Sequence, residues 1–280
     1  MPPAQHALSA HVEAKSVRGD TPCGPGTLAW RRWGSGRPVV LLHGGGGSWT
    51  HWIKNIEALS ESNTLWIPDL PGHGDSSLPS DDREINSSVE AIQNGIDHVI
   101  GQPYVLIGFS YGGLLGGLLA AARPDTVSRL ILVGAPGLGL YSRSDISLVS
   151  WRKLSDPAQR EEAHRQNLQK LMFSDSNSVD ALSVALYAAN TERDRLKHRS
   201  GMIYSDENVL RKKLPRITCP LYGIWGREDA LYRASLDALP LALSEAPDFR
   251  ELELIENAGH WVSYEGAPRF NQTVLRMLTS

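Results

Sequence analysis

Residues 104–113 read YVLIGFSYGG, in which a largely apolar run leads into a serine with a glycine two positions away on each side. Glycine has no side chain to clash, so Gly108 and Gly112 allow a strand to reverse sharply into a helix. Ser110 then stands at the N-terminus of that helix, where N–H groups and the helix dipole favour negative charge. This G-x-S-x-G pattern is typical of a nucleophile elbow, so we predict that Ser110 is a nucleophile. A serine that merely caps the helix is the alternative.

Two loops late in the chain hold the residues that would activate Ser110. A serine hydroxyl is a weak nucleophile at neutral pH and needs a general base, which in turn needs an orienting acid. Asp229 and His260 each follow an apolar run of strand length, in the chain order expected for this kind of triad. Asp237 and Asp248 are poorer acids because they lie in or after the next helical segment. A turn aspartate and an ordinary loop histidine are the alternatives.

Four consecutive glycines follow the first parallel strand in the stretch LLHGGGG, residues 41–47. Such a loop lets the backbone approach a ligand closely. We predict that the backbone N–H groups of Gly45 and Tyr111 stabilise the oxyanion of a tetrahedral intermediate. We expect His43 to brace this loop. A phosphate cradle would need a Walker A lysine or the G-x-G-x-x-G pattern with its acid, and the chain has neither.

Apolar runs of strand length alternate with helical patterns along most of the chain. Near-continuous apolar runs are expected where helices cover both faces of a parallel sheet, so the alternation predicts an α/β fold with a mostly parallel, doubly wound sheet. The stretch 27–36 is expected in an antiparallel hairpin at the edge of that sheet. Strands are expected at 38–43, 64–70, 104–110, 128–136, 219–226 and 250–257. Helices are expected at 51–62, 85–101, 110–124, 231–247 and 267–280.

This alternation stops between residues 137 and 215, where no strand pattern occurs. Helical patterns follow one another there, at 145–155, 156–174, 178–199 and 206–215. Ligands bind at the carboxyl edge of open α/β sheets, so we predict a helical cap, or lid, over that edge. The predicted division is a core of residues 1–136 and 216–280 with a cap of residues 137–215.

Net charge and cysteine content limit the binding partners and the cellular compartment that we expect. The 280 residues carry a formal net charge of −3, which argues against a nucleic acid or an anionic membrane as partner. We find no signal peptide, and no apolar stretch reaches the ~18 residues of a membrane helix. Cys23 and Cys219 are the only cysteines, so we expect a cytoplasmic protein without a disulfide framework. No CxxC or HExxH pattern occurs, and no metal is predicted.

Five motifs in order give the chain a resemblance to the α/β-hydrolase fold family. They are LLHGGGG, PDLPGHGDS, GFSYGG, GRED and NAGHW, and the resemblance covers nearly the whole chain. It implies that Ser110 is the nucleophile, Asp229 the triad acid and His260 the base. It also implies that Gly45 and Tyr111 supply the oxyanion donors and that no cofactor is needed. Family members that are dehalogenases or epoxide hydrolases carry an aspartate at the position of Ser110.

Within that family the chain is similar to the meta-cleavage product hydrolases, which cut a C–C bond in ring-fission products, and to related carboxylesterases. The stretch SRLILVGAPGLG and Trp261 directly after His260 resemble the former group. The glycine loop departs from that group's Gly-Pro-Gly-Ala, and His51 stands nearest to the position of its usual asparagine. The group also uses a lid arginine, for which Arg193 and Arg195 are candidates; solvated helix charge is the alternative.

Aromatic and sulfur-containing side chains near the predicted edge indicate a pocket for a small hydrophobic or aromatic acyl substrate. Core packing is the alternative for each tryptophan. The predicted pocket residues are Trp49, His51, Trp261, Arg193 and Arg195, and Trp52, Trp151 and Met172 lie in segments that could also line the pocket.

The leading interpretation is a serine hydrolase that acts on a carboxylic ester without a cofactor. A C–C bond hydrolase with the same triad is the first alternative, and it would also need a cation for the substrate carboxylate. A ligand-binding receptor that retains the triad is the second, because a fold does not determine a function. A cofactorless oxygenase or a perhydrolase is also compatible with the triad. The oligomeric state is left open.

Overall fold

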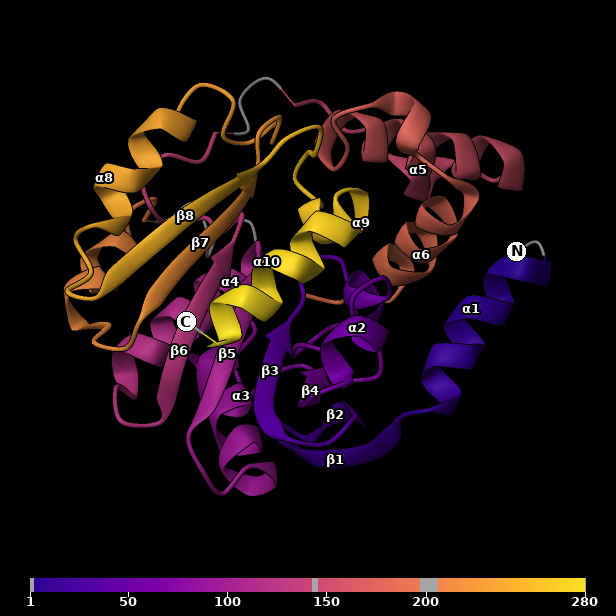
Figure 1. Ribbon diagram of the computed structural model, residues 1–280. Coiled ribbons are helices and arrows are strands. Elements are labelled where there is room, and N and C mark those ends of the chain that lie inside the picture. The colour runs from indigo at the N-terminus through magenta and orange to yellow at the C-terminus, as the bar shows by residue number, and fades with distance from the viewer. Residues whose placement is uncertain (1–2, 143–145, 197–205, 280) are drawn as a thin grey trace.

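The computed structural model describes residues 3–142, 146–196 and 206–279, and its strands form one eight-stranded sheet (Figure 1). The strands are β1 (Val17–Cys23), β2 (Gly26–Trp33), β3 (Arg37–Leu42), β4 (Asn63–Pro68), β5 (Tyr104–Phe109), β6 (Val127–Val133), β7 (Leu221–Gly226) and β8 (Phe249–Ile255). Their order across the sheet is β1-β2-β4-β3-β5-β6-β7-β8. β2 pairs antiparallel with β1 and β4, and every later pair is parallel. The predicted parallel strands and the antiparallel edge hairpin are confirmed.

Helices cover both faces of this sheet. α2, α9 and α10 pack on one face, where Figure 1 shows α10 lying across the strands, and α3, α4 and α8 pack on the other. The helices are α1 (Pro3–Ala14), α2 (Ile56–Ser60), α3 (Ile85–Val99), α4 (Tyr111–Ala122), α5 (Pro157–Leu171), α6 (Ala181–Glu192), α8 (Leu239–Leu243), α9 (Val262–Glu265) and α10 (Ala267–Thr279). Short 3₁₀ turns are η1 (Trp49–Trp52), η2 (Trp151–Lys153), η3 (Ser176–Ser178), η4 (Arg211–Arg216) and η5 (Leu236–Ala238).

The central strand β3 shows why its sequence is apolar throughout. Val39 and Leu41 join the cluster that contains α2 and α10, whereas Val40 and Leu42 join the cluster that contains α3 and α4. Successive side chains of a strand point to opposite faces, so a strand covered on both sides needs apolar residues at every position. The near-continuous apolar runs of the sequence are the result.

The described part of 137–215 contains α5, α6 and 3₁₀ turns and no strand. α5 and α6 pack beside each other, and Figure 1 shows them in the same part of the molecule as α9. Two helices predicted there, at 145–155 and 206–215, are wrong as α-helices, since their described residues form only η2 and η4. In the second case the backbone N–H groups of Leu210 and Arg211 both donate to Gly137 O at 2.9 Å, so they are not used for α-helical bonds within the segment. The boundaries of the cap stay a prediction.

Two core helices are shorter than predicted. The segment 231–247 forms a helix only from Leu239, because Pro240 fits only in the first turn of a helix. The segment 51–62 is interrupted at Asn55, whose side-chain amide donates to Ser263 O and Asn271 Oδ1, both at 2.8 Å, outside its own helix. Tertiary contacts therefore override the local pattern in the second case.

Two observations concern the expected surroundings of the protein. Among the described residues, no helix combines the length and the apolar character that crossing a bilayer requires. Cys23 and Cys219 are free and buried, and burial raises the pKa of each thiol to about 11, so both stay protonated at neutral pH. The cytoplasmic location stays a prediction.

α4 lies unusually close to the sheet at its first turn. A Cβ added to Gly112 would lie 2.4 Å from the carbonyl oxygen of Leu42 and 2.5 Å from that of His43, both backbone atoms that cannot rotate away. One turn further, a Cβ on Gly116 would lie 3.4 Å from the nearest atom, in the side chain of Leu106, which is ordinary contact. The first glycine is therefore required by the packing and the second is not.

We expect Gly112→Ala to lower the free energy of unfolding by about 1–3 kcal/mol, because the new methyl group would force α4 away from the sheet. Gly116→Ala is the matched control in the same helix, and we expect it to raise that free energy by up to ~1 kcal/mol through helix propensity. Urea unfolding followed by circular dichroism measures both. A Gly112→Ala protein as stable as the wild type would contradict the packing argument.

Candidate active site

Ser110 joins β5 to α4 in a strained conformation. Its φ is 49° and its ψ is −119°, a left-handed region that serine rarely occupies and that costs roughly 1–3 kcal/mol. A Cβ on Gly108 would lie 2.4 Å from the carbonyl oxygen of Gly112, so only glycine lets the helix fold back so tightly over the strand. The backbone N–H of Ser110 donates to Val133 O at 2.7 Å, which fixes the turn to the neighbouring strand.

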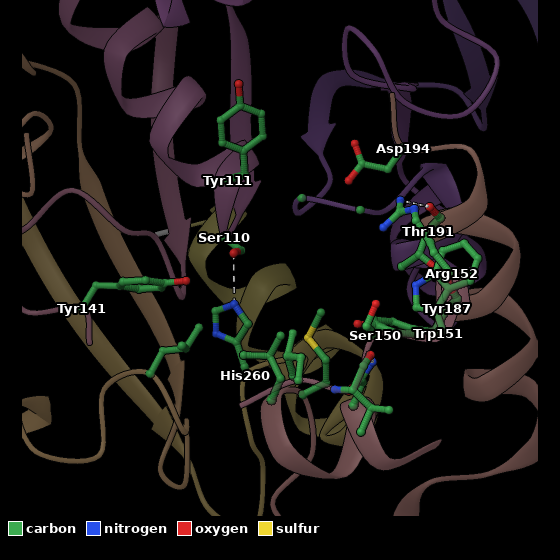
Figure 2. Close-up of a pocket in the computed structure, with 18 residues that line it drawn as sticks. Ser110, Tyr111, Tyr141, Ser150, Trp151, Arg152, Tyr187, Thr191, Asp194 and His260 are labelled. Carbon is green, nitrogen blue, oxygen red and sulfur yellow. Dashed lines mark hydrogen bonds between the residues drawn. The ribbon is translucent and has the colours of Figure 1, made fainter. Parts of the chain in front are cut away.

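The three predicted triad residues meet at this turn. His260 Nδ1 lies 2.8 Å from Asp229 Oδ2, and His260 Nε2 lies 3.0 Å from Ser110 Oγ, the contact drawn in Figure 2. Asp229 is fully buried, and its other oxygen accepts the N–H of Leu231 at 2.9 Å. A carboxylate can only accept, so Nδ1 carries the imidazole proton and Nε2 is left to accept the serine hydroxyl. Serine, histidine and aspartate thus form one hydrogen-bonded chain.

The loops that carry Asp229 and His260 are held together by backbone contact. They follow the parallel neighbours β7 and β8 and leave the sheet at the same edge. A Cβ on Gly226 would lie 2.2 Å from the carbonyl oxygens of Ala258 and Gly259, so the two loops touch where they begin. Gly134, with a φ of +54°, also lies close to the His260 ring. A Cβ added to it would be 3.1 Å from His260 Cε1.

The predicted oxyanion donors lie beside Ser110. Gly45 and Tyr111 both line the cavity that Ser110 faces. In Figure 2 the Tyr111 ring points away from Ser110, which leaves the backbone of this first α4 residue beside the serine. The first N–H groups of a helix have no partner within that helix and suit an anion. This arrangement can stabilise an oxyanion that forms on a carbonyl attacked by Ser110.

Two buried histidines hold the glycine loop from behind. His43 Nε2 accepts the N–H of Leu70 at 2.8 Å, so its Nδ1 carries the proton and donates to Gly44 O at 2.8 Å. His51 Nδ1 accepts the N–H of Gly44 at 3.2 Å, and a Cβ on Gly47 would lie only 2.3 Å from the His51 ring. The expectation that His43 braces this loop agrees with these contacts, and His51 does the same.

His51 is neutral in the folded protein. Burial, together with the nearby His43, His73 and His260, holds the pKa of His51 well below its usual value. Because Nδ1 is an acceptor, the proton of the neutral ring sits on Nε2, a buried atom for which the described residues supply no hydrogen-bond partner. Protonation of Nδ1 would replace the acceptor of the Gly44 N–H by a donor.

A cavity of about 270 Å³ opens in front of Ser110 and His260. Its far wall comes from segment 137–215 (the insertion) and mixes polar with apolar side chains. Figure 2 shows Tyr141 on one side of Ser110 and Trp151, Tyr187 and Arg152 on the other. The insertion contributes Tyr141, Leu148, Val149, Ser150, Trp151, Arg152, Asn167, Leu171, Met172, Tyr187, Thr191 and Asp194. Within the described ranges, no group of three or more His, Cys, Asp or Glu side chains is arranged to hold a metal ion.

The three buried residues predicted to line the pocket lie behind its wall, which corrects the expectation. Trp49 packs against Trp33 with ring centroids 5.5 Å apart. Trp261 is fully buried, and its Nε1–H donates to His51 O at 3.0 Å, so His51 and Trp261 support the glycine loop and the His260 loop from within the core. Core packing, the alternative for each tryptophan, describes Trp49 and Trp261.

The two predicted arginines also lie off the cavity wall. Arg193 pairs with Asp75, and the Arg195 guanidinium donates to the carbonyl oxygens of Gly74 and Ser76. Both follow α6 and attach it to the core loop that contains PDLPGHGDS. Because α6 ends at Glu192, the helical pattern of the sequence did not predict where the side chains of Arg193 and Arg195 point.

Several side chains on the cavity wall had no role in the sequence-based prediction. Arg152 lines the cavity and donates to Thr191 O at 3.2 Å, and Asp194 lines it with an oxygen 3.5 Å from His73 Nε2. Trp151 and Met172, which the sequence suggested, also line it. The sequence indicated only these two residues, through their aromatic and sulfur-containing side chains, and gave no local pattern that predicted Arg152 or Asp194.

The chain is similar to known proteins both in sequence and in structure. A family model described as the alpha/beta hydrolase fold matches residues 37–267. The 2-hydroxy-6-oxo-6-phenylhexa-2,4-dienoate hydrolase of Burkholderia cepacia is 27% identical over 262 residues, which cover 88% of this chain and 89% of that protein. The dihydrolipoyllysine-residue acetyltransferase component of the acetoin cleaving system of Pseudomonas putida is 28% identical over 267 residues, 90% of this chain but only 66% of that protein. A Bacillus subtilis carboxylesterase structure has a TM-score of 0.79 at 20% identity, covering 98% and 97% of the two chains.

We expect His51→Asn to lower the free energy of unfolding at pH 7 by about 1–3 kcal/mol, because the buried ring loses its contacts. The folded-state pKa of His51 lies below the unfolded value of 6.5, so the unfolded chain takes up the proton first. The stability that this ring contributes is therefore present above pH 6.5 and is lost as the pH falls, by at most ~1.4 kcal/mol per pH unit. The difference in the free energy of unfolding between the wild type and His51→Asn should therefore be smaller at pH 5 than at pH 7.

Urea unfolding at both pH values measures this gap. His98→Asn, on the exposed side of α3, is the control for losing a histidine that is not buried. An equal gap at pH 7 and pH 5 for His51→Asn would show that this ring does not resist protonation.

Proposed function

Because this chain belongs to the α/β hydrolase fold family, we propose that it is a serine hydrolase that cleaves a small carboxylic ester. The observation that carries the proposal is the hydrogen-bonded chain from Ser110 through His260 to Asp229, with Ser110 Oγ facing a cavity. The chain is a hydrolase by family, and the ester specificity and the roles of these residues are the proposal. The carboxylesterase neighbour supports the fold alone.

The proposed reaction has two halves. Ser110 Oγ attacks the ester carbonyl carbon and gives its proton to His260 Nε2, while the buried Asp229 stabilises the imidazolium. The N–H groups of Gly45 and Tyr111 stabilise the oxyanion. The C–O bond then breaks, and the alcohol leaves with the proton from His260. Water, deprotonated by His260, attacks the acyl-enzyme, and the acid leaves as Ser110 regains its proton.

The cavity favours a small substrate. A volume of about 270 Å³ lies just below the range of about 300–1,000 Å³ that is usual for small-molecule sites. Trp151 and Tyr187 offer aromatic surface, whereas Ser150 and Thr191 offer hydroxyl oxygens at the cap side. We therefore propose an ester with a short acyl or aryl group that also carries polar atoms.

C–C bond hydrolysis is the second candidate, and one observation favours it. Arg152 lies on the cavity wall across from Ser110 in Figure 2, where it could bind the carboxylate of a dienoate substrate. The Burkholderia relative is named as a hydrolase of such a compound. Asp194 lines the same wall and would repel a carboxylate, so we place this candidate second.

We expect Ser110→Ala to reduce kcat for p-nitrophenyl acetate by a factor of about 10⁴ to 10⁶, because the nucleophile is removed from the triad. Asp229→Asn should reduce kcat by roughly 10⁴, since an amide donor would favour the wrong imidazole tautomer. Ser150→Ala, at the cap side of the same cavity, is the matched serine control and should change KM more than kcat. Turnover by Ser110→Ala near the wild-type rate would exclude a serine nucleophile. Ligand binding without turnover by the wild type would favour the receptor alternative.

Arg152→Gln separates the two candidate substrates. We expect it to lower kcat/KM for a phenyl-substituted 2-hydroxy-6-oxo-hexadienoate by about 10- to 100-fold, the effect of losing a charged hydrogen bond to a carboxylate. A neutral aryl ester should change only a few-fold. Arg160→Gln is the control, because Arg160 also stacks on Trp151 but does not line the cavity. Wild-type kcat/KM about 100-fold higher for the dienoate than for the ester would reverse our ranking.

A further inference from the structure

The carboxylate of Glu265 connects two segments that are far apart in the sequence. Glu265 is the last residue of α9 and is half-buried. Its Oε2 accepts the backbone N–H of Gly259 at 2.6 Å and that of Ser174 at 2.9 Å. Its Oε1 accepts the Ser174 hydroxyl at 2.9 Å and the N–H of Asp175 at 3.2 Å. One side chain thus accepts from three backbone N–H groups and one hydroxyl group, which belong to two segments of the chain.

These two backbones are in direct contact at that point. The N–H of Trp261 donates to Met172 O at 2.8 Å, across from the Glu265 bonds. A Cβ on Gly259 would lie 2.6 Å from the Phe173 carbonyl carbon and 2.7 Å from Ser174 N, so the crossing requires glycine. The aromatic rings of Phe173 and Trp261 pack beside it, with centroids 6.2 Å apart.

The position of this crossing relates it to the proposed reaction. Gly259 directly precedes His260, whose ring reaches Ser110. On the other segment, Leu171 and Met172 line the cavity, and only Phe173 separates them from Ser174, which Glu265 binds. The crossing therefore joins the part of the insertion that contacts a substrate to the loop that holds the general base.

We propose that Glu265 is a positioning residue that couples segment 171–175 of the insertion to His260. The proposal rests on the proposed function, because it assigns His260 the role of base for Ser110. In this arrangement His260 keeps its alignment with Ser110 only while the segment after α5 is seated. A substrate that contacts Met172 then acts on the base through the carboxylate.

Carboxylate chemistry makes the coupling testable with a nearly isosteric change. Both oxygens of Glu265 accept from backbone N–H groups, so glutamine would place its NH₂ group against a donor in either orientation. Glu265→Gln must therefore lose the acceptor of either the Gly259 N–H or the Asp175 N–H, together with the negative charge, which weakens the crossing on one side or the other. Misplacement of a catalytic group by a fraction of an ångström slows a reaction strongly, and we expect a fall in serine reactivity of about 10- to 100-fold.

A fluorophosphonate probe measures this reactivity without the natural substrate. The Ser110 Oγ–P bond forms, the P–F bond breaks, fluoride leaves, and the serine proton passes to His260. We expect Glu265→Gln to lower the labelling rate at 25 °C by about 10- to 100-fold.

Hydrogen–deuterium exchange measures the crossing itself. In Glu265→Gln, exchange should rise both at residues 172–175 and at residues 257–262. Glu256→Gln is the matched control, because Glu256 lies in the loop that carries His260 but is exposed and pairs only with Arg227 among the described residues. Ser174→Ala, which removes only the hydroxyl donor, should shift both readouts in the same direction by less.

The outcomes are distinguishable. A Glu265→Gln protein that is labelled at the wild-type rate, with a lower melting temperature only, would overturn the coupling and leave a structural role. Increased exchange at one of the two segments without the other would overturn it too. Failure of the probe to label wild-type Ser110 would instead refute the proposed nucleophile, and the exchange data alone would then decide whether Glu265 joins the two segments. If Glu265→Gln does not fold, Ser174→Ala carries the same comparison.

Discussion

The close approach of α4 to the sheet at Gly112 is the constraint on which the site depends. It leaves no room for a side chain between the helix and the ends of β3, and it forces the preceding turn to reverse within a few residues. Ser110 takes up that reversal with a φ of 49°. The strain is tolerated because parallel strands and buried apolar residues hold both arms of the turn. It places a hydroxyl where two strand-end loops can reach it.

The glycine loop beside Ser110 is supported by two buried histidines. His43 and His51 each bond to Gly44, one to its carbonyl oxygen and one to its N–H, so the glycine loop is held from both sides. His51 can accept that bond only as the neutral imidazole, and burial keeps it neutral. The two histidines thus hold Gly44, which directly precedes the proposed oxyanion donor Gly45.

The insertion is attached to the core after each of its two helices, α5 and α6. After α5, the crossing at Gly259 and the Glu265 carboxylate tie segment 172–175 to the His260 loop. After α6, Arg193 and Arg195 bind the loop that contains Asp75. The cavity lies between these attachments. Side chains that sequence alone suggested as ligands of a substrate instead hold the wall in place.

The sequence by itself determined the strand alternation, the elbow and the residues of the hydrogen-bonded chain. Each of these rests on a local pattern: apolar runs, glycines around Ser110, and Asp229 and His260 at strand ends, which parallel strands bring to one edge. The tertiary structure decided which side chains line the cavity. Trp49 and Trp261 lie in the core, while Tyr141 and Arg152 line the cavity, because that choice depends on how the insertion docks. Docking is set by distant contacts, such as Glu265 with Ser174, that no local pattern records.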